Sequence, residues 1–573
     1  MAFDDIYPEG HQGGVCIIMN GHRVATNGDI RLEATPGQWQ PVPKQLDRKL
    51  GDNSITATLC YPDSSRHLTG FNPMIYPDLH LIYTVNVESK GKNIEVTVDL
   101  DRPIPQEFIG KVGFNLEFFP GSLFGKPWIM DGQSGIFPQQ PNSPLMTTQP
   151  NYLHTGNYHD GKKSLADMDK LIGKGYSPIV ADDIISEPYA KGTKFTSRPD
   201  DPYNKVTIES LSGDLQLFDG RMNHNNGWFV LRSNIKPGVT KGAVKWIITP
   251  NVVADWMYQP VIQTSQIGYH PTQDKEAVIE MDIRDNRKET AQIIRIDADG
   301  EKVVKNVTPA NWGKFLRYNY LKVNFTDVKE PGLYKIKYNT SVSPIFRIDN
   351  DVYARGVWQP VLEYFLPVQM CHMRVNEKYR VWHDCCHMDD AQMAPAHNHI
   401  DGYDQKEGLS KFKPGEVVPG VNIGGWHDAG DFDLRIESQA GESYILALAY
   451  EAFHPNLDVT SIDQINRVTE IHQPDGKNDL LQQVENGALT VVNGYLALGR
   501  LYRGIICNDL RQYVLLGDAA AMTDGKIGNE DDRWIFTEDN PGRELSTAAQ
   551  LAAVSRVLKG FNDTLSVHCL SLI

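Results

Sequence analysis

The spacing of the apolar residues changes once along this chain, and this change limits the folds that it can adopt. As far as about residue 350, apolar and polar residues alternate in short runs such as 80–87 and 94–100, a pattern typical of half-buried strands. After Asp351 the apolar residues recur at steps of three or four, which describes one face of a helix. The longest such series is Leu481, Val484, Ala488, Val491, Tyr495, Leu498 and Tyr502. A shorter one, Ala548, Leu551, Val554 and Leu558, follows Ser546, a residue type that caps helix N-termini.

The length of the chain predicts several domains, because 573 residues are too many for one hydrophobic core. Residues 1–256 are expected to form a large antiparallel β-sandwich with long loops rich in proline and glycine. Residues 257–350 have the size of an immunoglobulin-like β-sandwich and contain the turn signals Asp299-Gly300 and Pro331-Gly332. Residues 351–573 are predicted to be all-α.

Charge and hydropathy exclude two classes of partner. The formal net charge of −16 disfavours nucleic acid and anionic membranes, and it is compatible with a neutral polysaccharide. No apolar run is long enough to cross a bilayer, so no transmembrane segment is predicted. The start of the chain, MAFDDIYPEG, has neither the basic nor the apolar region of a secretory signal peptide. The seven cysteines are an odd and partly clustered set, which does not resemble a disulfide framework.

Two carboxylates lie three residues apart in the glycine-rich segment 424–431, GGWHDAGD. Side chains at this spacing project from the same side if the turn leads into a helix, and a helical pattern does follow it. Two like charges held close together make one of them the stronger proton acceptor, which a general base requires. Asp428 and Asp431 are therefore candidate catalytic residues, although an Asp at this place also suits a helix cap. Trp426 beside them is either a sugar-contacting residue or a packing residue.

Two cysteines and two histidines form a second candidate group: Cys371, Cys386, His387 and His427. They offer two thiolates and two imidazoles, the ligand set of a closed tetrahedral zinc site. The alternative is that the cysteines are simply buried apolar residues. The choice of ligands stays open because the same stretch also contains Cys385, His383, His397 and His399.

Several motifs occur in a recognisable order. The expected second sandwich opens with Ser265-Gln266-Ile267-Gly268-Tyr269-His270-Pro271 and closes with Pro331-Gly332-Leu333-Tyr334. The segments 424–431, 474–481 and 532–536 follow it. In this order the motifs resemble glycoside hydrolase family nine, the cellulase family with an N-terminal Ig-like domain. The resemblance covers residues from about 260 to 570, whereas the preceding residues resemble only an additional β module of some bacterial members.

The resemblance implies an inverting hydrolase of β-1,4-linked glucans whose catalytic domain is an (α/α)6 barrel. It makes Asp431 the general base and Asp428 a helper that orients the same water, while Trp426 stays a candidate substrate contact with packing as the alternative. An inverting mechanism also needs a protonated carboxyl group on the other face of the sugar, about 6.5–9.5 Å from the base. Polymeric glucan lies outside the cell, so the intact parent enzyme is expected to be periplasmic or secreted.

The resemblance also bears on metals. Members of the family with the Ig-like domain hold zinc through a Cys, Cys-His and His arrangement like that of Cys371, Cys386, His387 and His427. Such a zinc ion would be structural and would fix the turn that carries the aspartates. Calcium is known among relatives, but no oxygen-rich loop of this sequence can be assigned to it.

The chain departs from the family towards its C-terminus. The part after Asn350 is too short for a complete barrel, so only a partial barrel is expected. The family's general acid is a Glu in a stretch that resembles N-x-x-E followed by D-Y-N, and this sequence has none. Glu437, Glu442 and Glu485 each fit a helix surface, and none is nominated as a substitute. The expectation is therefore a truncated enzyme whose activity is lost or weak; the alternative is an inactive glycan-binding or structural fragment.

Overall fold

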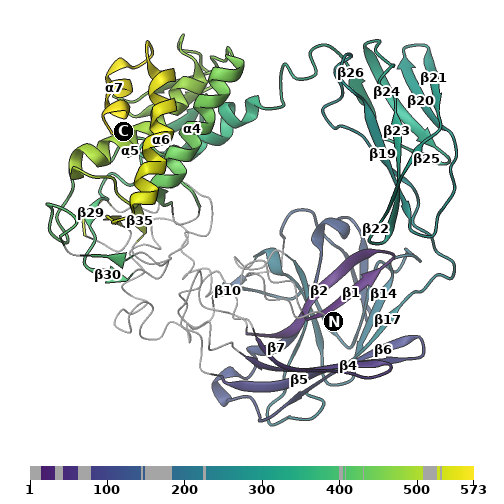
Figure 1. Cartoon of the computed structure of the whole chain (residues 1–573). Coiled ribbons are helices and arrows are strands. Elements are labelled where there is room, and N and C mark those ends of the chain that lie inside the picture. Colours follow the sequence, from purple (N-terminus) through teal and green to yellow (C-terminus); the bar gives the residue numbers. More distant parts are fainter. Residues whose placement is uncertain are drawn as a thin grey trace.

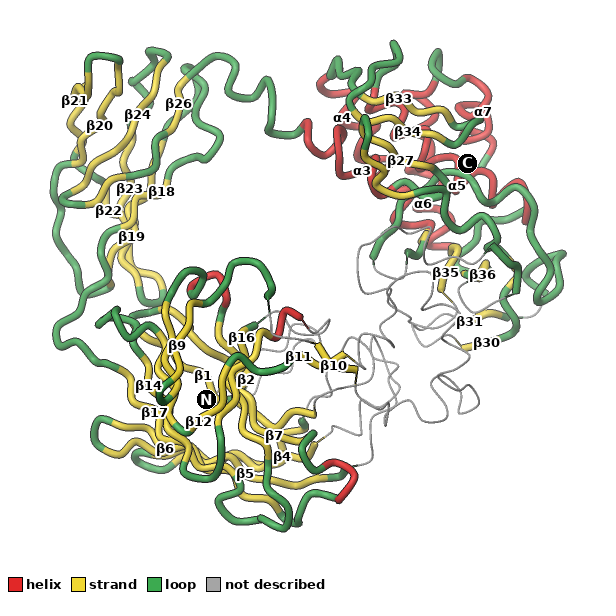
Figure 2. The backbone as a smooth tube through the Cα atoms, turned by 180° about the vertical axis from the view of Figure 1, so that it is seen from behind, coloured by secondary structure: helices red, strands yellow, loops and turns green. Residues whose placement is uncertain are grey.

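The computed structural model describes residues 14–32, 43–61, 79–142, 146–148, 184–222, 228–398, 404–406, 408–429, 432–507, 525–528 and 532–572. Within them two β units are followed by a mainly helical unit, and each has a hydrophobic core (Figure 1). The view from behind in Figure 2 shows the same order, with strands in the first two units and most helices in the last. The change in apolar spacing predicts this order.

The first β unit contains two antiparallel sheets. The six-stranded sheet has the order β1 (Val15–Met19), β2 (His22–Leu32), β7 (Val112–Phe118), β16 (Phe229–Asn234), β15 (Leu215–Asp219) and β12 (Ala190–Gly192). The nine-stranded sheet has the order β3 (Lys44–Leu50), β4 (Ser54–Tyr61), β5 (Leu81–Lys90), β6 (Asn93–Leu100), β17 (Val244–Pro250), β14 (Val206–Ser210), β13 (Lys194–Ser197), β8 (Pro127–Met130) and β9 (Gln133–Ile136). Strands β10 (Met146–Thr148) and β11 (Ile184–Ser186) pair separately.

One core joins the two large sheets of the first β unit. Alternate residues of β5 and β17 are buried, as expected of strands with one face against another sheet. Phe114 of β7 meets Trp246 of β17 edge to face, with ring centroids 5.1 Å apart, so side chains from both sheets interlock. Single 3-10 turns lie at Gln106–Phe108, Pro120–Ser122 and Gly220–Met222.

The second β unit is a smaller sandwich. One sheet has the order β18 (Val261–Gln263), β19 (Glu276–Asp282), β23 (Tyr318–Asn324) and β22 (Ala310–Phe315). The other has the order β21 (Gly300–Val307), β20 (Ala291–Asp297), β24 (Gly332–Tyr338) and β25 (Ser341–Val342), with β26 (Phe346–Ile348) also on β24. Tyr269 packs edge to face on Phe325 and Phe346 in the core between them.

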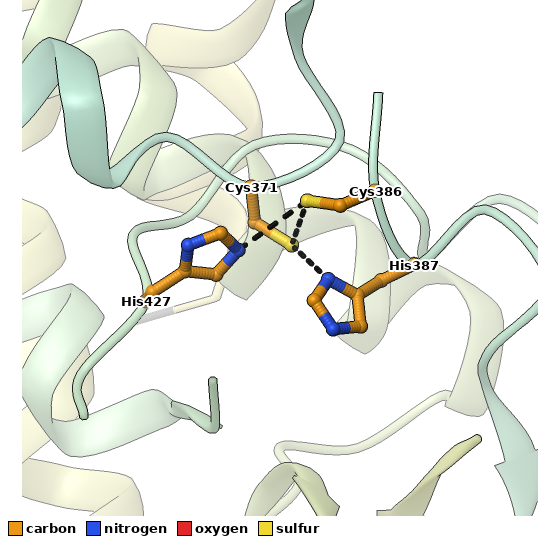
Figure 3. Close-up of side chains that lie close together, drawn as sticks. All are labelled: Cys371, Cys386, His387 and His427. Carbon is orange, nitrogen blue, oxygen red and sulfur yellow. Dashed lines mark hydrogen bonds between the residues drawn. The ribbon is translucent and has the colours of Figure 1, made fainter. Parts of the chain in front are cut away.

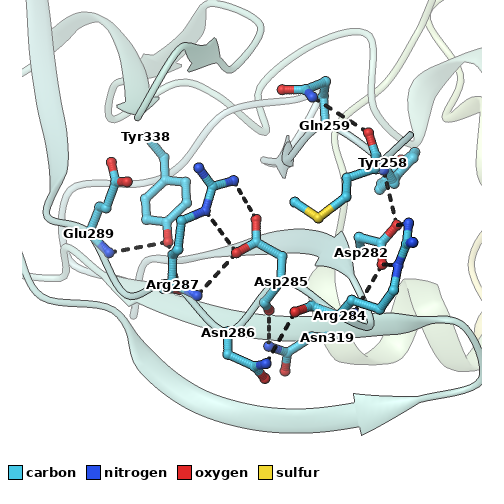
Figure 4. A network of polar contacts seen from close by, with 11 residues as sticks. Tyr258, Gln259, Asp282, Arg284, Asp285, Asn286, Arg287, Glu289, Asn319 and Tyr338 are labelled. Carbon is cyan, nitrogen blue, oxygen red and sulfur yellow. Dashed lines mark hydrogen bonds and ion pairs between the residues drawn. The ribbon is translucent and has the colours of Figure 1, made fainter. Parts of the chain in front are cut away.

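A polar network holds the chain where β19 ends in the second β unit (Figure 4). Arg284 Nε donates to Asp282 Oδ1 at 2.9 Å, and Arg287 Nη2 donates to Asp285 Oδ2 at 2.6 Å. Asn319 Nδ2 donates to the Asp285 carbonyl oxygen at 2.8 Å, which ties this loop to β23. Each carboxylate lies two residues before its arginine, so these ion pairs are local. They fix the loop by polar contacts rather than by apolar packing.

The helical unit packs four helices side by side (Figure 1). They are α4 (Ile436–Phe453), α5 (Asp479–Leu498), α6 (Pro541–Leu558) and α7 (Asp563–Ser571), after a π-helical turn at Val361–Phe365 and α3 (Leu366–Gln369). Asparagine side chains cap three of them, because Asn478, Asn540 and Asn562 accept hydrogen bonds from amides in the first turns of α5, α6 and α7. Helix α6 therefore begins before the predicted Ser546 cap, which is a correction to the sequence prediction.

The prediction of an all-α C-terminal third is correct for these helices and wrong for the segments between them. One sheet has the order β28 (Arg380–His383), β27 (Arg374–Glu377), β34 (Val468–Ile471) and β33 (Thr460–Asp463). Another has the order β29 (Gln392–Met393), β36 (Arg533–Phe536), β35 (Gly504–Cys507) and β32 (Leu434–Arg435), and β30 (His397–Asn398) pairs with β31 (Asp404–Gln405). These strands have two to four residues, too few to show a period, and several of them pair with segments distant in the sequence, such as β27 with β34 and β29 with β36. Among the helices described, none has both the length and the hydropathy to span a bilayer.

Candidate functional site

The glycine turn before the candidate aspartates lies against helix α5. Gly424 and Gly425 have φ angles of 69° and 85°, in the left-handed region that glycine adopts without strain. A Cβ atom on Gly424 would lie 2.3 Å from the Asn486 carbonyl oxygen, so only glycine allows this close approach. The Gly425 amide donates to the same oxygen at 3.0 Å, and Asn486 Nδ2 donates to the Gly425 carbonyl at 3.1 Å. The two glycines thus fix where the following residues begin.

Of the two roles predicted for Trp426, its geometry favours packing. Its side chain is buried, and its indole Nε1 donates to Gln483 Oε1 at 2.8 Å. The Trp426 amide donates to Gln439 Oε1, and Gln439 Nε2 donates to the Trp426 carbonyl oxygen, both at 2.9 Å. A ring enclosed in this way offers no face to a sugar. The sequence alone does not tell which way a tryptophan beside a glycine turn points.

Asp428 is the described member of the carboxylate pair, while Gly430 and Asp431 lie outside the described residues. Its side chain is 22% exposed, and its Oδ2 lies 3.3 Å from Arg435 Nε. Arg435 also approaches the buried Asp433 at 3.5 Å, so one guanidinium serves two carboxylates. Burial raises the pKa of Asp428, and the positive charge of Arg435 opposes this rise.

Glu442 on helix α4 is a further carboxylate that interacts with Asp428. Burial raises the pKa of Glu442, and the negative charge of Asp428 raises it further. In the sequence Glu442 reads as a helix-surface residue, because its relation to Asp428 depends on how α4 packs beside the turn. The sequence likewise does not indicate that Arg435 lies beside Asp428, because this contact also depends on how the segments pack.

The four predicted metal ligands come together (Figure 3). Cys371, Cys386, His387 and His427 are all buried, and their donor atoms lie within 4.8 Å of one another. Cys371 follows α3, Cys386 and His387 follow β28, and His427 lies in the glycine turn. Three segments distant in the sequence therefore meet at one point.

The spacing of these donors fits a tetrahedral zinc ion. With Zn–S distances of about 2.3 Å and Zn–N distances of about 2.0–2.1 Å, a tetrahedron places its sulfurs about 3.8 Å apart and each sulfur about 3.6 Å from a nitrogen. Cys371 Sγ lies 3.9 Å from Cys386 Sγ and 3.7 Å from His387 Nδ1, and Cys386 Sγ lies 3.4 Å from His427 Nε2. The residues present thus suit such an ion in number, donor type and spacing.

Without an ion the buried cysteine pair holds one thiolate and one thiol, because burial and the neighbouring Cys371 raise the pKa of Cys386 well above its usual value, and metal binding would release that remaining proton. Burial opposes ionisation of Cys371, yet the hydrogen bond with Cys386 and nearby positive charges lower the pKa of Cys371 well below its usual value. Burial lowers the pKa of His387 to about 3, and it lowers the pKa of His427 as well. Neutral imidazoles are the form that binds a metal ion.

The neighbouring residues that kept the ligand choice open are occupied elsewhere. The thiol of Cys385 is partly exposed and donates to the Arg467 carbonyl oxygen at 3.7 Å. The two ring nitrogens of His383 lie 2.9 Å and 3.1 Å from the backbone carbonyl oxygens of Asp384 and Val368. His399 lies outside the described residues, as does the side chain of His397.

A buried arginine beside the cluster was missed from the sequence. Arg533, at the start of β36, donates through Nη2 to Cys371 Sγ at 3.4 Å and forms an ion pair with the buried Asp390. A second group of carboxylates, Asp389, Asp390 and Asp532, has oxygens within 4.8 Å of one another. Because Asp390 already pairs with Arg533, this group is not assigned to the calcium ion that the resemblance suggests.

The comparisons with known proteins give one family match, at residues 257–343, to the model described as "Cellulase N-terminal ig-like domain". Among solved structures, "Bacteroides ovatus GH9" is similar at a TM-score of 0.41 and 18% identity, covering 55% of this chain and 52% of that one. The Zn-binding triple mutant of GH family 9 endoglucanase J30 is similar at a TM-score of 0.39 and 21% identity, covering 53% of this chain and 51% of that one. GH family 9 endoglucanase J30 itself is similar at a TM-score of 0.39 and 20% identity, with the same coverage of 53% of this chain and 51% of that one. The chain spans about half the length of these structures. No curated protein matches it.

Proposed function

The chain carries the N-terminal Ig-like domain of cellulases, and from this premise we propose that it is a glycoside hydrolase of family nine acting on β-1,4-linked glucans. The family match confirms the resemblance predicted from the motifs at the two ends of the second β unit. The single observation that carries the proposal is this domain followed, in the same chain, by the glycine turn with its two aspartates.

The proposed reaction inverts the configuration at the anomeric carbon. Asp431 takes a proton from the attacking water, and Asp428 orients that water. Arg435, 3.3 Å from Asp428, supports the ionised form of that helper carboxylate. Departure of the leaving sugar needs a second carboxyl group on the other face of the ring, and acid catalysis of this kind supplies roughly 10²–10⁴ in rate.

Zinc is proposed as a structural ion bound by Cys371, Cys386, His387 and His427. Four protein donors fill a tetrahedral site and leave no position for water or substrate. The ion would therefore take no part in bond cleavage. Its effect on the reaction would come through His427, which is the residue before Asp428.

The proposal includes the organisation of the whole chain. Residues 1–256 form an N-terminal β module, 257–350 the Ig-like domain, and 351–573 part of an (α/α)6 barrel. Since the substrate is an extracellular polymer, the intact enzyme would work in the periplasm or outside the cell. The helices α4 to α7, packed side by side, support the barrel assignment.

An assay with carboxymethyl cellulose and cellohexaose tests the proposal. We expect release of reducing sugar with inverted anomeric configuration, seen by NMR, and a rate at least 100-fold lower for Asp431→Asn, in line with the 10²–10⁴ range for general base catalysis. The control is Asp299→Asn, an exposed turn residue of the Ig-like domain, which should leave the rate unchanged. Binding of cellohexaose by calorimetry without turnover would instead indicate a glycan-binding protein, and the absence of both would overturn the proposal in favour of a structural role.

A further inference from the structure

The guanidinium of Arg533 joins three segments that are distant in the sequence. Its Nε donates to the Asp390 carboxylate, its Nη1 donates to the Phe432 carbonyl oxygen, and its Nη2 donates to Cys371 Sγ at 3.4 Å. The Arg533 amide also donates to Asp390 Oδ1 at 3.2 Å. The arginine and Asp390 are both 1% exposed. A buried charge of this kind persists only where its partners satisfy it, so each of these contacts is needed.

One of these acceptors belongs to a strained residue. Phe432 directly follows Asp431 and has a φ angle of 59°, the left-handed region that a bulky residue rarely adopts. Such a conformation persists only where the surroundings enforce it. The ring of Phe432 packs on both candidate imidazole ligands, with centroids 4.8 Å from His427 and 5.4 Å from His387. Arg533 holds the carbonyl group of the same residue.

Another acceptor is a candidate metal ligand. An N–H group directed at the sulfur of a metal ligand fixes the orientation of that ligand, as contacts behind metal ligands do. The same guanidinium therefore contacts the metal cluster through Cys371 and the aspartate turn through Phe432. Only arginine presents several donors in one rigid plane, whereas lysine has a single ammonium group on a flexible stem.

We propose that Arg533 is a positioning residue that couples the metal-binding thiolate of Cys371 to the turn carrying Asp428 and Asp431. This inference rests on the proposed function for its catalytic consequence, but not for the coupling itself. The buried position of the arginine gives it a structural rather than a chemical role. Its role is to keep Phe432 in its left-handed conformation and so to fix this end of the turn.

The first test compares Arg533→Lys with wild type after zinc is replaced by cobalt(II). Loss of the N–H···S contact should shift the sulfur-to-cobalt charge-transfer absorption and weaken zinc binding by 10–100-fold, as other changes behind metal ligands do. The matched control is Arg503→Lys, because Arg503 is also buried and ion-paired, to Glu437, and precedes the neighbouring strand β35. A folded Arg533→Lys chain with the wild-type cobalt spectrum and zinc affinity would overturn the proposal.

The second test uses the wild-type chain and so does not depend on whether a variant folds. Hydrogen exchange is followed by mass spectrometry before and after zinc is removed by chelation. We expect peptides containing Phe432 and Arg533 to lose protection together, while peptides of β5 in the first β unit stay unchanged. Loss of protection at Phe432 without any change at Arg533 would contradict the coupling. If both tests succeed but no glucan is cleaved, the proposed function fails and the coupling stands.

Discussion

Cys385 and Cys386 are neighbours in the sequence, but only Cys386 points into the metal cluster. Cys386 Sγ lies 3.9 Å from Cys371 Sγ, whereas the Cys385 thiol donates to the Arg467 carbonyl oxygen at 3.7 Å. Burial raises the pKa of the Cys385 thiol, so it stays protonated at neutral pH. Two residues of the same type, one position apart, therefore make a matched pair for experiment.

We expect Cys386→Ser to lose bound zinc and Cys385→Ser to keep it. Removing a ligand should weaken zinc binding by at least the 10–100-fold that changes behind the ligands cause. Metal content by mass spectrometry, after dialysis against a weak chelator, measures this directly. Equal zinc content in the two variants would contradict the assignment of Cys386 as a ligand.

The sequence predicted the members of the metal cluster better than the residues around it. Cys371, Cys386, His387 and His427 stand out because few residue types bind zinc and all four occur in two short stretches. Arg533 was missed because its partners lie far away in the sequence, Asp390 by 143 positions and Phe432 by 101. No local pattern records a contact of that kind.

At the scale of elements, α4 and α5 approach closely at a glycine. A Cβ atom on Gly487 in α5 would lie 2.2 Å from Ser443 Oγ of α4 and 2.3 Å from the Trp426 ring. Gly441 in α4 has room, since its nearest neighbour would be Gln550 Nε2 at 3.7 Å. The close contact lets α5 press Trp426 against the glycine turn, which links helix packing to the position of Asp428.

We expect Gly487→Ala to destabilise the helical unit and Gly441→Ala to stabilise it slightly. Overpacking against a rigid ring costs about 1–3 kcal/mol, whereas alanine is favoured over glycine in a helix by up to about 1 kcal/mol. Urea unfolding followed by far-ultraviolet circular dichroism would measure both. A Gly487→Ala chain as stable as wild type would show that α4 and α5 can separate without loss.

Helices were predicted well where the repeat of apolar residues is long enough to detect. The series from Leu481 to Tyr502 marks α5, which spans Asp479–Leu498 and is capped by Asn478. The start of α6 was misplaced because Ser546 and Asn540 are both capping types, and only tertiary packing selects Asn540. The two- to four-residue strands between the helices are too short to show a period, and for pairs such as β27 with β34 the partner also lies far away in the sequence.

The loop after β19 should make the second β unit sensitive to acid. The hydrogen bonds from Arg284 and Arg287 lower the pKa values of Asp282 and Asp285. A carboxyl group with a lowered pKa in the folded state stabilises it above its ordinary pKa of 3.8, and this contribution is lost as the pH falls through the folded value.

We therefore expect Asp285→Asn to lower the free energy of unfolding at pH 7 by about 1.5–3 kcal/mol, the range for hydrogen bonds to charged groups. The difference from wild type should shrink as the pH falls below about 4, because the wild-type carboxyl group then becomes protonated in the unfolded chain, whereas its lowered pKa keeps it ionised in the folded chain until the pH falls further. Urea unfolding monitored at several pH values provides the measurement, with Asp299→Asn as the control. A difference that stays constant from pH 7 to pH 2 would contradict the role of the ionised carboxylate.

At the scale of the whole molecule, the three units have separate cores. The core of the first β unit contains residues from Val15 to Ile248, and that of the second from Ile262 to Ile348. Cys371 and Cys386 belong to a third core, within the helical unit. A multidomain chain of this kind unfolds in more than one transition, and an ion held by one unit acts on that unit alone.

Removal of zinc should therefore lower the melting temperature of only one unfolding transition, that of the helical unit. An ion that binds only the folded state stabilises it by RT ln(1 + [L]/Kd), about 4 kcal/mol at a thousandfold excess over Kd, which moves the melting temperature of a unit of this size by roughly 10 °C. Differential scanning calorimetry with and without a chelator should show this shift in the transition of the helical unit, while the transitions of the two β units stay in place. In the Cys386→Ser chain the chelator should move no transition. A joint shift of all transitions would mean that the units unfold together, and the absence of any shift in the wild-type chain would mean that the four donors hold no ion.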